Sequence, residues 1–130
     1  MSQQHIGLTA AEWRVMECLW ERAPQTGREM TLLLEKTEGW SRSTTLTLLS
    51  RLEAKGAVGG NTAGGIKTFS PLLRREDAAL RETESLLARV YNGSISMMVS
   101  TLTRKRALSQ KEIDELYAML KELEGGEDHD

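Results

Sequence analysis

The side chains best placed to do chemistry are short hydroxyls and cations gathered in one segment, residues 40–56. At helical spacing, one side of the segment carries Ser43, Thr47 and Ser50. The cations around them are Arg42, Arg51 and Lys55. Short hydroxyls let a backbone approach closely and still offer hydrogen bonds to the base edges of a DNA groove. The pattern predicts a helix that binds DNA, and an ordinary amphipathic helix with a hydrated polar face is the open alternative.

The same segment also carries an apolar stripe, by which the predicted helix can pack against a hydrophobic core. The stripe follows the spacing i, i+3, i+4 and i+7 of an α-helix: Thr45, Leu48, Leu49 and Leu52. We predict a helix that begins after Ser41 as N-cap and ends at Gly56, which suits a left-handed C-cap. Leu46 lies at the edge of the outward face, where it either meets a thymine methyl group or completes the core.

Three further helix starts carry the capping-box signature, a hydroxyl residue followed three positions later by Glu. The pairs are Thr9 with Glu12, Thr26 with Glu29, and Ser109 with Glu112. The first two predict helices over about 9–22 and 27–38, and Pro24 prevents the first from continuing. Short turns therefore join three short helices in the first half of the chain.

A glycine-rich stretch follows these helices. Gly59, Gly60, Gly64 and Gly65 surround a predicted tip, with strands expected over 57–60 and 66–70. Three helices followed by a β-hairpin is the element order of a winged helix-turn-helix. Lys67 on the hairpin is then expected to contact a phosphate, and a mobile glycine loop without a ligand is the alternative.

Charge is unevenly distributed along the 130 residues. The net charge of -2 and a pI near 5.8 argue against a generic nucleic-acid binder, because such domains usually carry a basic excess. Residues 41–75, however, hold six basic residues against one acid, Glu53, a local balance of +5. From residue 107 onward there are two basic and eight acidic residues. The acidic C-terminal residues therefore offset the positive charge of residues 41–75 in the net charge of the whole chain.

The chain beyond Pro71 is predicted to be helical again, with apolar stripes at helical spacing. Because the first seventy residues already supply a core, we expect these stripes to pair with a second chain, or alternatively to fold back on the N-terminal part. The expected dimerisation residues are Leu87, Val90, Ile95, Met98, Val99, Leu102, Ile113, Leu116, Tyr117 and Leu120. The expected domains are a winged helix over 1–73, a helical dimerisation region over 74–124 and a disordered acidic end over 125–130.

Catalysis, cofactor binding and metal binding are not expected. His5 and His129 are the only imidazoles, both near the ends, and no hydrolase or zinc motif is present. Cys18 stands alone in an apolar helical pattern and is expected to be buried. Without a signal peptide or a long apolar run, the chain is expected to be cytoplasmic.

Five blocks in the same order resemble the penicillinase-repressor family, the BlaI/MecI/CopY group of bacterial transcriptional regulators. They are LTAAEWRVMECLW (8–20), WSRSTTLTLLSRLEAKG (40–56), FSP (69–71), VYNGS (90–94) and LSQKEIDELYAML (108–120). The resemblance implies a fold that is mainly α with a small β-hairpin, a winged helix-turn-helix domain followed by a C-terminal helical dimerisation region. It also implies a homodimer that represses resistance or stress genes from a palindromic operator. A winged-helix module that binds only proteins is the alternative.

The resemblance carries over unevenly to individual residues. The residue types of the family's recognition-helix motif also occur here at Ser41, Thr44, Thr47, Leu48, Arg51, Leu52 and Gly56. Well-known members carry other residue types at the positions of Arg42, Ser43 and Leu46. The expected DNA-binding residues are Ser41, Arg42, Ser43, Thr44, Thr45, Leu46, Thr47, Arg51 and Lys67. The paired CxC motifs of copper-responsive members are absent, so that soft-metal site is excluded. The bond that a sensor protease cuts in β-lactam-linked members corresponds here to Thr101-Leu102, a hypothetical cleavage site.

Overall fold

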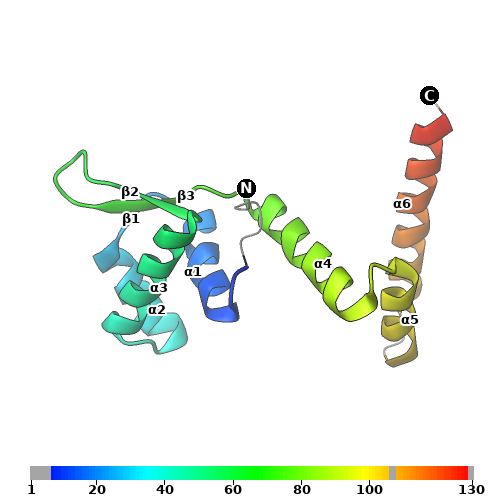
Figure 1. Cartoon of the computed structure of the whole chain (residues 1–130), viewed down its shortest axis with the longest axis horizontal. Coiled ribbons are helices and arrows are strands. Elements are labelled where there is room, and N and C mark those ends of the chain that lie inside the picture. The colour runs from blue at the N-terminus through cyan, green and yellow to red at the C-terminus, as the bar shows by residue number, and fades with distance from the viewer. Residues whose placement is uncertain (1–6, 106–107, 129–130) are drawn as a thin grey trace. The chain divides into compact units, whose positions relative to one another are not determined.

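The structure is a computed structural model that describes residues 7–105 and 108–128. His5, His129 and the last residue of the acidic end lie outside the described residues. The elements, shown in Figure 1, are α1 (Ala10–Glu21), β1 (Gln25–Thr26), α2 (Gly27–Glu38), α3 (Arg42–Lys55), β2 (Val58–Asn61), β3 (Thr68–Pro71), α4 (Arg75–Tyr91), α5 (Ile95–Lys105) and α6 (Gln110–Asp128). The chain divides into two compact units, Met1–Ser85 and Leu86–Asp130.

The first two helices begin where their capping boxes predict. The Thr9 hydroxyl accepts from the Glu12 backbone N–H at 3.1 Å, and the Glu12 carboxylate accepts from the Thr9 N–H at 2.9 Å. The same reciprocal bonds, at 3.0 and 2.8 Å, join Thr26 and Glu29 before α2. Each box satisfies backbone donors that a helix start otherwise leaves open. The sequence prediction of these two boundaries is confirmed.

The third helix also has the predicted ends. The Ser41 hydroxyl accepts from the Thr44 N–H at 3.2 Å. Gly56 closes α3 in the left-handed conformation, with φ 82°, which a side chain disfavours. Both ends of α3 are therefore set by residues that lie next to them in the sequence.

The α6 helix begins with the third capping box and ends later than predicted. The Ser109 hydroxyl accepts from the Glu112 N–H at 3.1 Å, and the Ser109 N–H donates to the Glu112 carboxylate at 3.1 Å. The helix then continues through Gly125 to Asp128, so residues 125–128 are helical rather than disordered. Glycine lowers helix stability by about 1 kcal/mol relative to alanine, but a helix that is already nucleated gains one hydrogen bond per added residue.

A small antiparallel sheet completes the first unit, with strand order β1-β3-β2. In its register, Phe69 faces Gly60 on one side and Gln25 on the other. The β2–β3 hairpin is the one predicted, whereas β1 is too short to leave a periodic signal. Gln25 is 1% exposed and its amide donates to the carbonyls of Cys18 and Arg22 at 3.1 and 2.7 Å, which anchors β1 to the end of α1.

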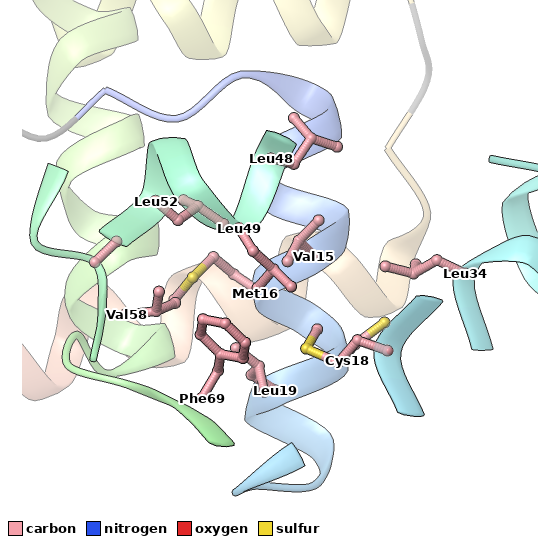
Figure 2. Close-up of a cluster of buried hydrophobic side chains, with 12 residues drawn as sticks. Val15, Met16, Cys18, Leu19, Leu34, Leu48, Leu49, Leu52, Val58 and Phe69 are labelled. Atoms are coloured by element: carbon pink, nitrogen blue, oxygen red, sulfur yellow. The ribbon is translucent and has the colours of Figure 1, made fainter. Parts of the chain in front are cut away.

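The core of this unit is built from α1, α2, α3 and the hairpin. Figure 2 shows side chains from α1 and α3 meeting Val58 and Phe69. The buried hydrophobic cluster consists of Val15, Met16, Cys18, Leu19, Met30, Leu34, Leu48, Leu49, Leu52, Ala57, Val58 and Phe69. Met30, Leu33 and Leu34 of α2 stand at helical spacing, but Leu33 lies outside this cluster and is 36% exposed. Three helices and a hairpin around one core make this unit a winged helix-turn-helix.

The start of α4 belongs to the same unit. Ala78 is buried, and the Trp20 indole N–H donates to the Leu73 carbonyl at 2.8 Å. The sequence places the domain boundary at 73–74, whereas the division of the structure falls inside α4. These contacts explain the difference, because they hold the first turns of α4 against α1. In the part of the chain that the structure describes, no helix is both long enough and apolar enough to cross a bilayer.

A buried ion pair joins the end of α3 to the start of α1. The Lys55 ammonium lies 2.5 Å from the Glu12 carboxylate and donates to the Gly7 carbonyl at 2.7 Å. The Glu12 side chain is 1% exposed and that of Lys55 is 33% exposed. Burial raises the pKa of the Glu12 carboxyl, but hydrogen bonds from Lys55 and Thr9 and the Lys55 charge outweigh it, and the net pKa lies below its ordinary value. The pair therefore favours an ionised Glu12 and holds both helices together.

We predict that Lys55→Met lowers the free energy of unfolding by about 2 kcal/mol at pH 7, because a buried carboxylate loses its charged donor. Since the folded pKa of Glu12 is depressed, its contribution is present above about pH 4.3, the usual unfolded value, and is lost as pH falls through the folded pKa. Urea unfolding should therefore show a smaller difference in stability between the wild type and Lys55→Met at pH 3.5 than at pH 7. Lys36→Met, at an exposed lysine of α2, is the control, and an equal loss in both variants contradicts the assignment.

Candidate nucleic-acid interface

Exposed polar side chains surround the start of α3 and continue along its outward face. They are Ser41, Arg42, Ser43, Thr44, Thr47, Ser50 and Arg51. The Ser41 hydroxyl lies 3.0 Å from that of Thr44 and 3.2 Å from that of Ser43. These three hydroxyls form a small network at the start of the helix, where backbone N–H groups and the helix dipole favour a negative group.

A shallow hollow of about 260 Å³ lies on this face, lined by Ser43, Thr44, Thr47, Leu48 and Arg51. It presents hydroxyl donors and acceptors beside a guanidinium, which is the combination that base edges and phosphates accept. The sequence prediction had placed all of these residues except Leu48 in the DNA-binding set, and the structure brings them together on one surface.

Arg42 and Arg51 are the two cations of the predicted basic zone that remain open to a ligand. Within the described parts of the chain, no acidic side chain lies within ion-pairing distance of either guanidinium. The other four cations are each paired. Lys55 contacts Glu12, Lys67 contacts Glu53, Arg74 contacts Asp77 and Arg75 contacts Glu17. The local charge of +5 counted along the sequence is therefore largely neutralised in space.

Arg75 shows how this neutralisation arises. Its guanidinium lies 3.3 Å from the Glu17 carboxylate, and 5.7 and 6.0 Å from the ring centroids of Trp13 and Trp20. Glu17 also pairs with Arg14, which bonds to Glu38 of α2 at 2.9 Å. This network ties α1, α2 and α4 together, so Arg75 supports the fold and is not free for a phosphate.

Thr45 is the one member of the predicted set that the structure places in the core. Its side chain is 0% exposed, because it begins the apolar stripe that packs inward. Its hydroxyl has no hydrogen-bond partner among the described residues. A side chain held in the core cannot reach a base edge or a phosphate while α3 keeps its packing. We therefore leave Thr45 out of the interface.

Leu46 lies at the seam between α2 and α3. It is half-buried and packs against the core cluster. A Cβ atom at Gly27, the first residue of α2, would lie 3.4 Å from a Leu46 methyl carbon. The two helices thus approach closely at this point, and the structure supports the core role of Leu46 while leaving part of the side chain accessible.

Lys67, predicted to contact a phosphate, is engaged within the protein. Its ammonium lies 3.1 Å from the Glu53 carboxylate of α3 and 5.2 Å from the Phe69 ring centroid. In the sequence, Glu53 is notable only as the single acid of residues 41–75. Its pairing was missed because residues 14 positions apart on different elements leave no local signal.

Known proteins are similar to this chain over most of its length. A family model described as penicillinase repressor matches residues 8–122. A penicillinase repressor of Bacillus licheniformis is 34% identical over 115 residues, which cover 88% of this chain and 90% of that protein. The methicillin resistance regulatory protein MecI of Staphylococcus aureus (strain N315) is 27% identical over 120 residues, covering 92% and 98%. The solution structure of the DNA-binding domain of the repressor BlaI matches with a TM-score of 0.52 and 30% identity, covering 56% of this chain and 89% of that domain.

The placement of Thr45 predicts that Thr45→Val raises the free energy of unfolding by about 1 kcal/mol, because valine removes an unpaired buried hydroxyl at nearly constant shape. Affinity for duplex DNA should stay within about twofold. Thr44→Val makes the same chemical change one residue earlier, on the exposed face, and should weaken DNA binding without the gain in stability. Thermal unfolding and fluorescence anisotropy measure the two effects, and a large loss of affinity in Thr45→Val would return this residue to the interface.

Proposed function

The chain belongs to the penicillinase repressor family and is a DNA-binding transcriptional repressor, and we propose that it acts as a homodimer on a palindromic operator. The family and the fold are those of transcriptional repressors, which are not enzymes. The observation that carries the proposal is the outward face of α3, where the hydroxyls of Ser43, Thr44 and Thr47 lie beside the unpaired guanidinium of Arg51. In this proposal α3 enters the major groove, with Ser43, Thr44 and Thr47 toward base edges or phosphates.

Exposed apolar side chains on the C-terminal helices support the homodimer. Among the large hydrophobic residues exposed on the single chain are Val90 (51%), Ile95 (62%), Leu102 (45%), Leu116 (42%), Tyr117 (66%) and Leu120 (59%). Leu87, Met98 and Ile113 of the predicted set are half-buried, and Val99 is 38% exposed. Large apolar side chains exposed in such numbers normally mark an interface. A second copy of the same helices would cover these side chains, and the same surface on both chains suits a two-fold axis.

Two linked winged helices explain both affinity and symmetry. If the half-sites lie one helical turn apart, the two α3 helices would sit about 34 to 36 Å apart in successive major grooves. Binding of the second half-site is then intramolecular, so the dimer binds far more tightly than one winged helix alone. A dimer seated on a promoter blocks transcription sterically. We propose antibiotic-resistance or stress genes as its targets, and any signal that loosens the dimer would release it.

Cleavage at Thr101-Leu102 by a sensor protease stays a prediction. The bond lies inside α5, where the Thr101 hydroxyl donates to the Met97 carbonyl at 3.1 Å. A protease would have to unwind this turn before it could reach the bond. Cleavage there would separate the first part of α5 from α6, and thus divide the proposed dimer surface.

The operator itself can be found by selecting fragments of the source genome on the immobilised full chain. We expect enriched fragments to share a palindrome whose half-sites mirror the protein symmetry. Bound fragments without a common sequence would contradict the specific operator.

With such a fragment, Arg51→Ala should weaken binding and flatten the plot of log affinity against log salt by about one unit per protomer, because one phosphate contact is lost. Anisotropy titrations between 50 and 200 mM NaCl measure the slope. Lys111→Ala removes one positive charge from α6, outside the proposed interface, and should leave the slope unchanged. A slope that does not change in Arg51→Ala would remove Arg51 from phosphate contact.

For the dimer, Leu120→Glu should shift the sedimenting species from dimer to monomer at micromolar concentration, since a charge is then placed in an apolar contact. Operator affinity should fall with it, while thermal unfolding of the winged helix keeps its midpoint. Lys121→Glu introduces the same side chain at the next position, outside the predicted apolar set, and should remain dimeric. A dimeric Leu120→Glu variant would exclude this face from the interface.

A further inference from the structure

We propose that Glu53 restrains Lys67, the only cation of the β2–β3 hairpin (residues 58–71), which forms the wing of the fold. Lys67 is then held on α3 and does not bind a phosphate in the DNA complex. Glu53 is then a positioning residue that sets how much the wing contributes to binding. This inference rests on the proposed function, and it replaces the sequence expectation that Lys67 contacts phosphate.

The pair is built into the junction of α3 and the hairpin. Glu53 lies in the last turn of α3, and Lys67 directly precedes β3. Their charged atoms lie 3.1 Å apart, with side chains 34% and 46% exposed. A contact with the Phe69 ring, 5.2 Å from the ammonium, adds a second attraction for the cation at the same place.

Gly60 of β2 provides the space that this pair occupies. A Cβ atom at Gly60 would collide with Cε of Lys67 and would lie 2.8 Å from the Glu53 carboxylate. The two side chains therefore cross over the strand where it has no side chain of its own. Because three elements shape this arrangement, the ion pair is more than a chance encounter of two flexible side chains.

The charges around the Glu53–Lys67 ion pair determine whether the pair persists when the protein approaches DNA. Lys67 is the single charged residue between residues 56 and 73, and Glu53 is the single acid between residues 41 and 75. If Lys67 turned to a phosphate, it would exchange one anionic partner for another and leave the Glu53 carboxylate uncompensated beside a polyanion. Keeping the pair avoids that repulsion. The wing then approaches DNA as a neutral surface, whose remaining tip residues 61–66 are uncharged and exposed.

This restraint has a consequence for specificity. Phosphate contacts strengthen binding to every sequence, whereas base contacts of α3 distinguish sequences. A lysine held away from phosphate lowers non-specific affinity without touching the groups that read bases. Glu53 thus raises the ratio of specific to non-specific binding, which is the quantity that matters when a genome supplies many competing sites.

The test compares Glu53→Gln, Lys67→Met and the double variant, each as the full chain, on a random-sequence 30-base-pair duplex between 50 and 200 mM NaCl. In Glu53→Gln the freed Lys67 should bind phosphate, steepen the salt slope by about 0.9 per protomer and raise affinity several-fold at low salt. In the Lys67→Met background the same substitution should leave the slope at the wild-type value. Glu53→Asp, which keeps the carboxylate, should stay close to wild type, and Glu53→Ala should repeat the effect of Gln.

An unchanged or flatter slope in Glu53→Gln overturns the inference. So does an equal steepening with and without Lys67, because Glu53 would then act through the general field of the protein. If the wild-type chain binds neither this duplex nor any selected genomic fragment at 50 mM salt, the proposed function itself fails. Circular dichroism and thermal unfolding verify that each variant is folded, and Glu35→Gln, at an exposed carboxylate of α2, is the matched control for loss of one negative charge.

Discussion

The rotation of α3 about its own axis is the constraint on which the rest of this structure depends. Leu48, Leu49 and Leu52 are buried with Thr45 against α1 and the hairpin. With one stripe of a helix fixed inward, the opposite stripe must face solvent. The Lys55–Glu12 pair ties the end of the same helix to the start of α1. Ser43, Thr47 and Arg51 therefore share a surface that suits the proposed entry of α3 into a DNA groove, and the buried residues determine which side of the helix this is.

An acidic protein can bind DNA when the surface that meets the phosphates keeps cations that no acidic side chain neutralises. Partners from α1, α3 and α4 neutralise four of the six cations between residues 41 and 75. Arg42 and Arg51 remain open on the face of α3. Pairing of the other four cations within the protein limits its sequence-independent attraction to phosphate. The restraint that we propose for Lys67 is part of this effect. Charge in this fold serves mainly to join elements, and a small remainder serves binding.

Membership of the family establishes the type of activity and leaves the target sequence open. Arg42, Ser43 and Leu46 depart from the types that well-known members carry. In the structure, Arg42 and Ser43 lie on the exposed face, while Leu46 is half-buried beside α2. We propose that base selection depends chiefly on the exposed hydroxyls of α3. In the proposed homodimer the apolar C-terminal helices add no base contacts and determine the spacing at which the two α3 helices meet one operator.

Elements whose signals are local can be predicted from the amino-acid sequence. Capping boxes join residues three positions apart, and a left-handed glycine ends α3, so the bounds of α1, α2 and α3 followed from neighbouring residues. The hairpin followed from its glycines. Only the tertiary structure decided the pairing of Lys67 with Glu53, of Lys55 with Glu12 and of β1 with β3, as well as the division of the chain inside α4. Periodicity fixes how residues are arranged around one element, whereas the partner of a charge depends on which elements pack together, and no local pattern records that.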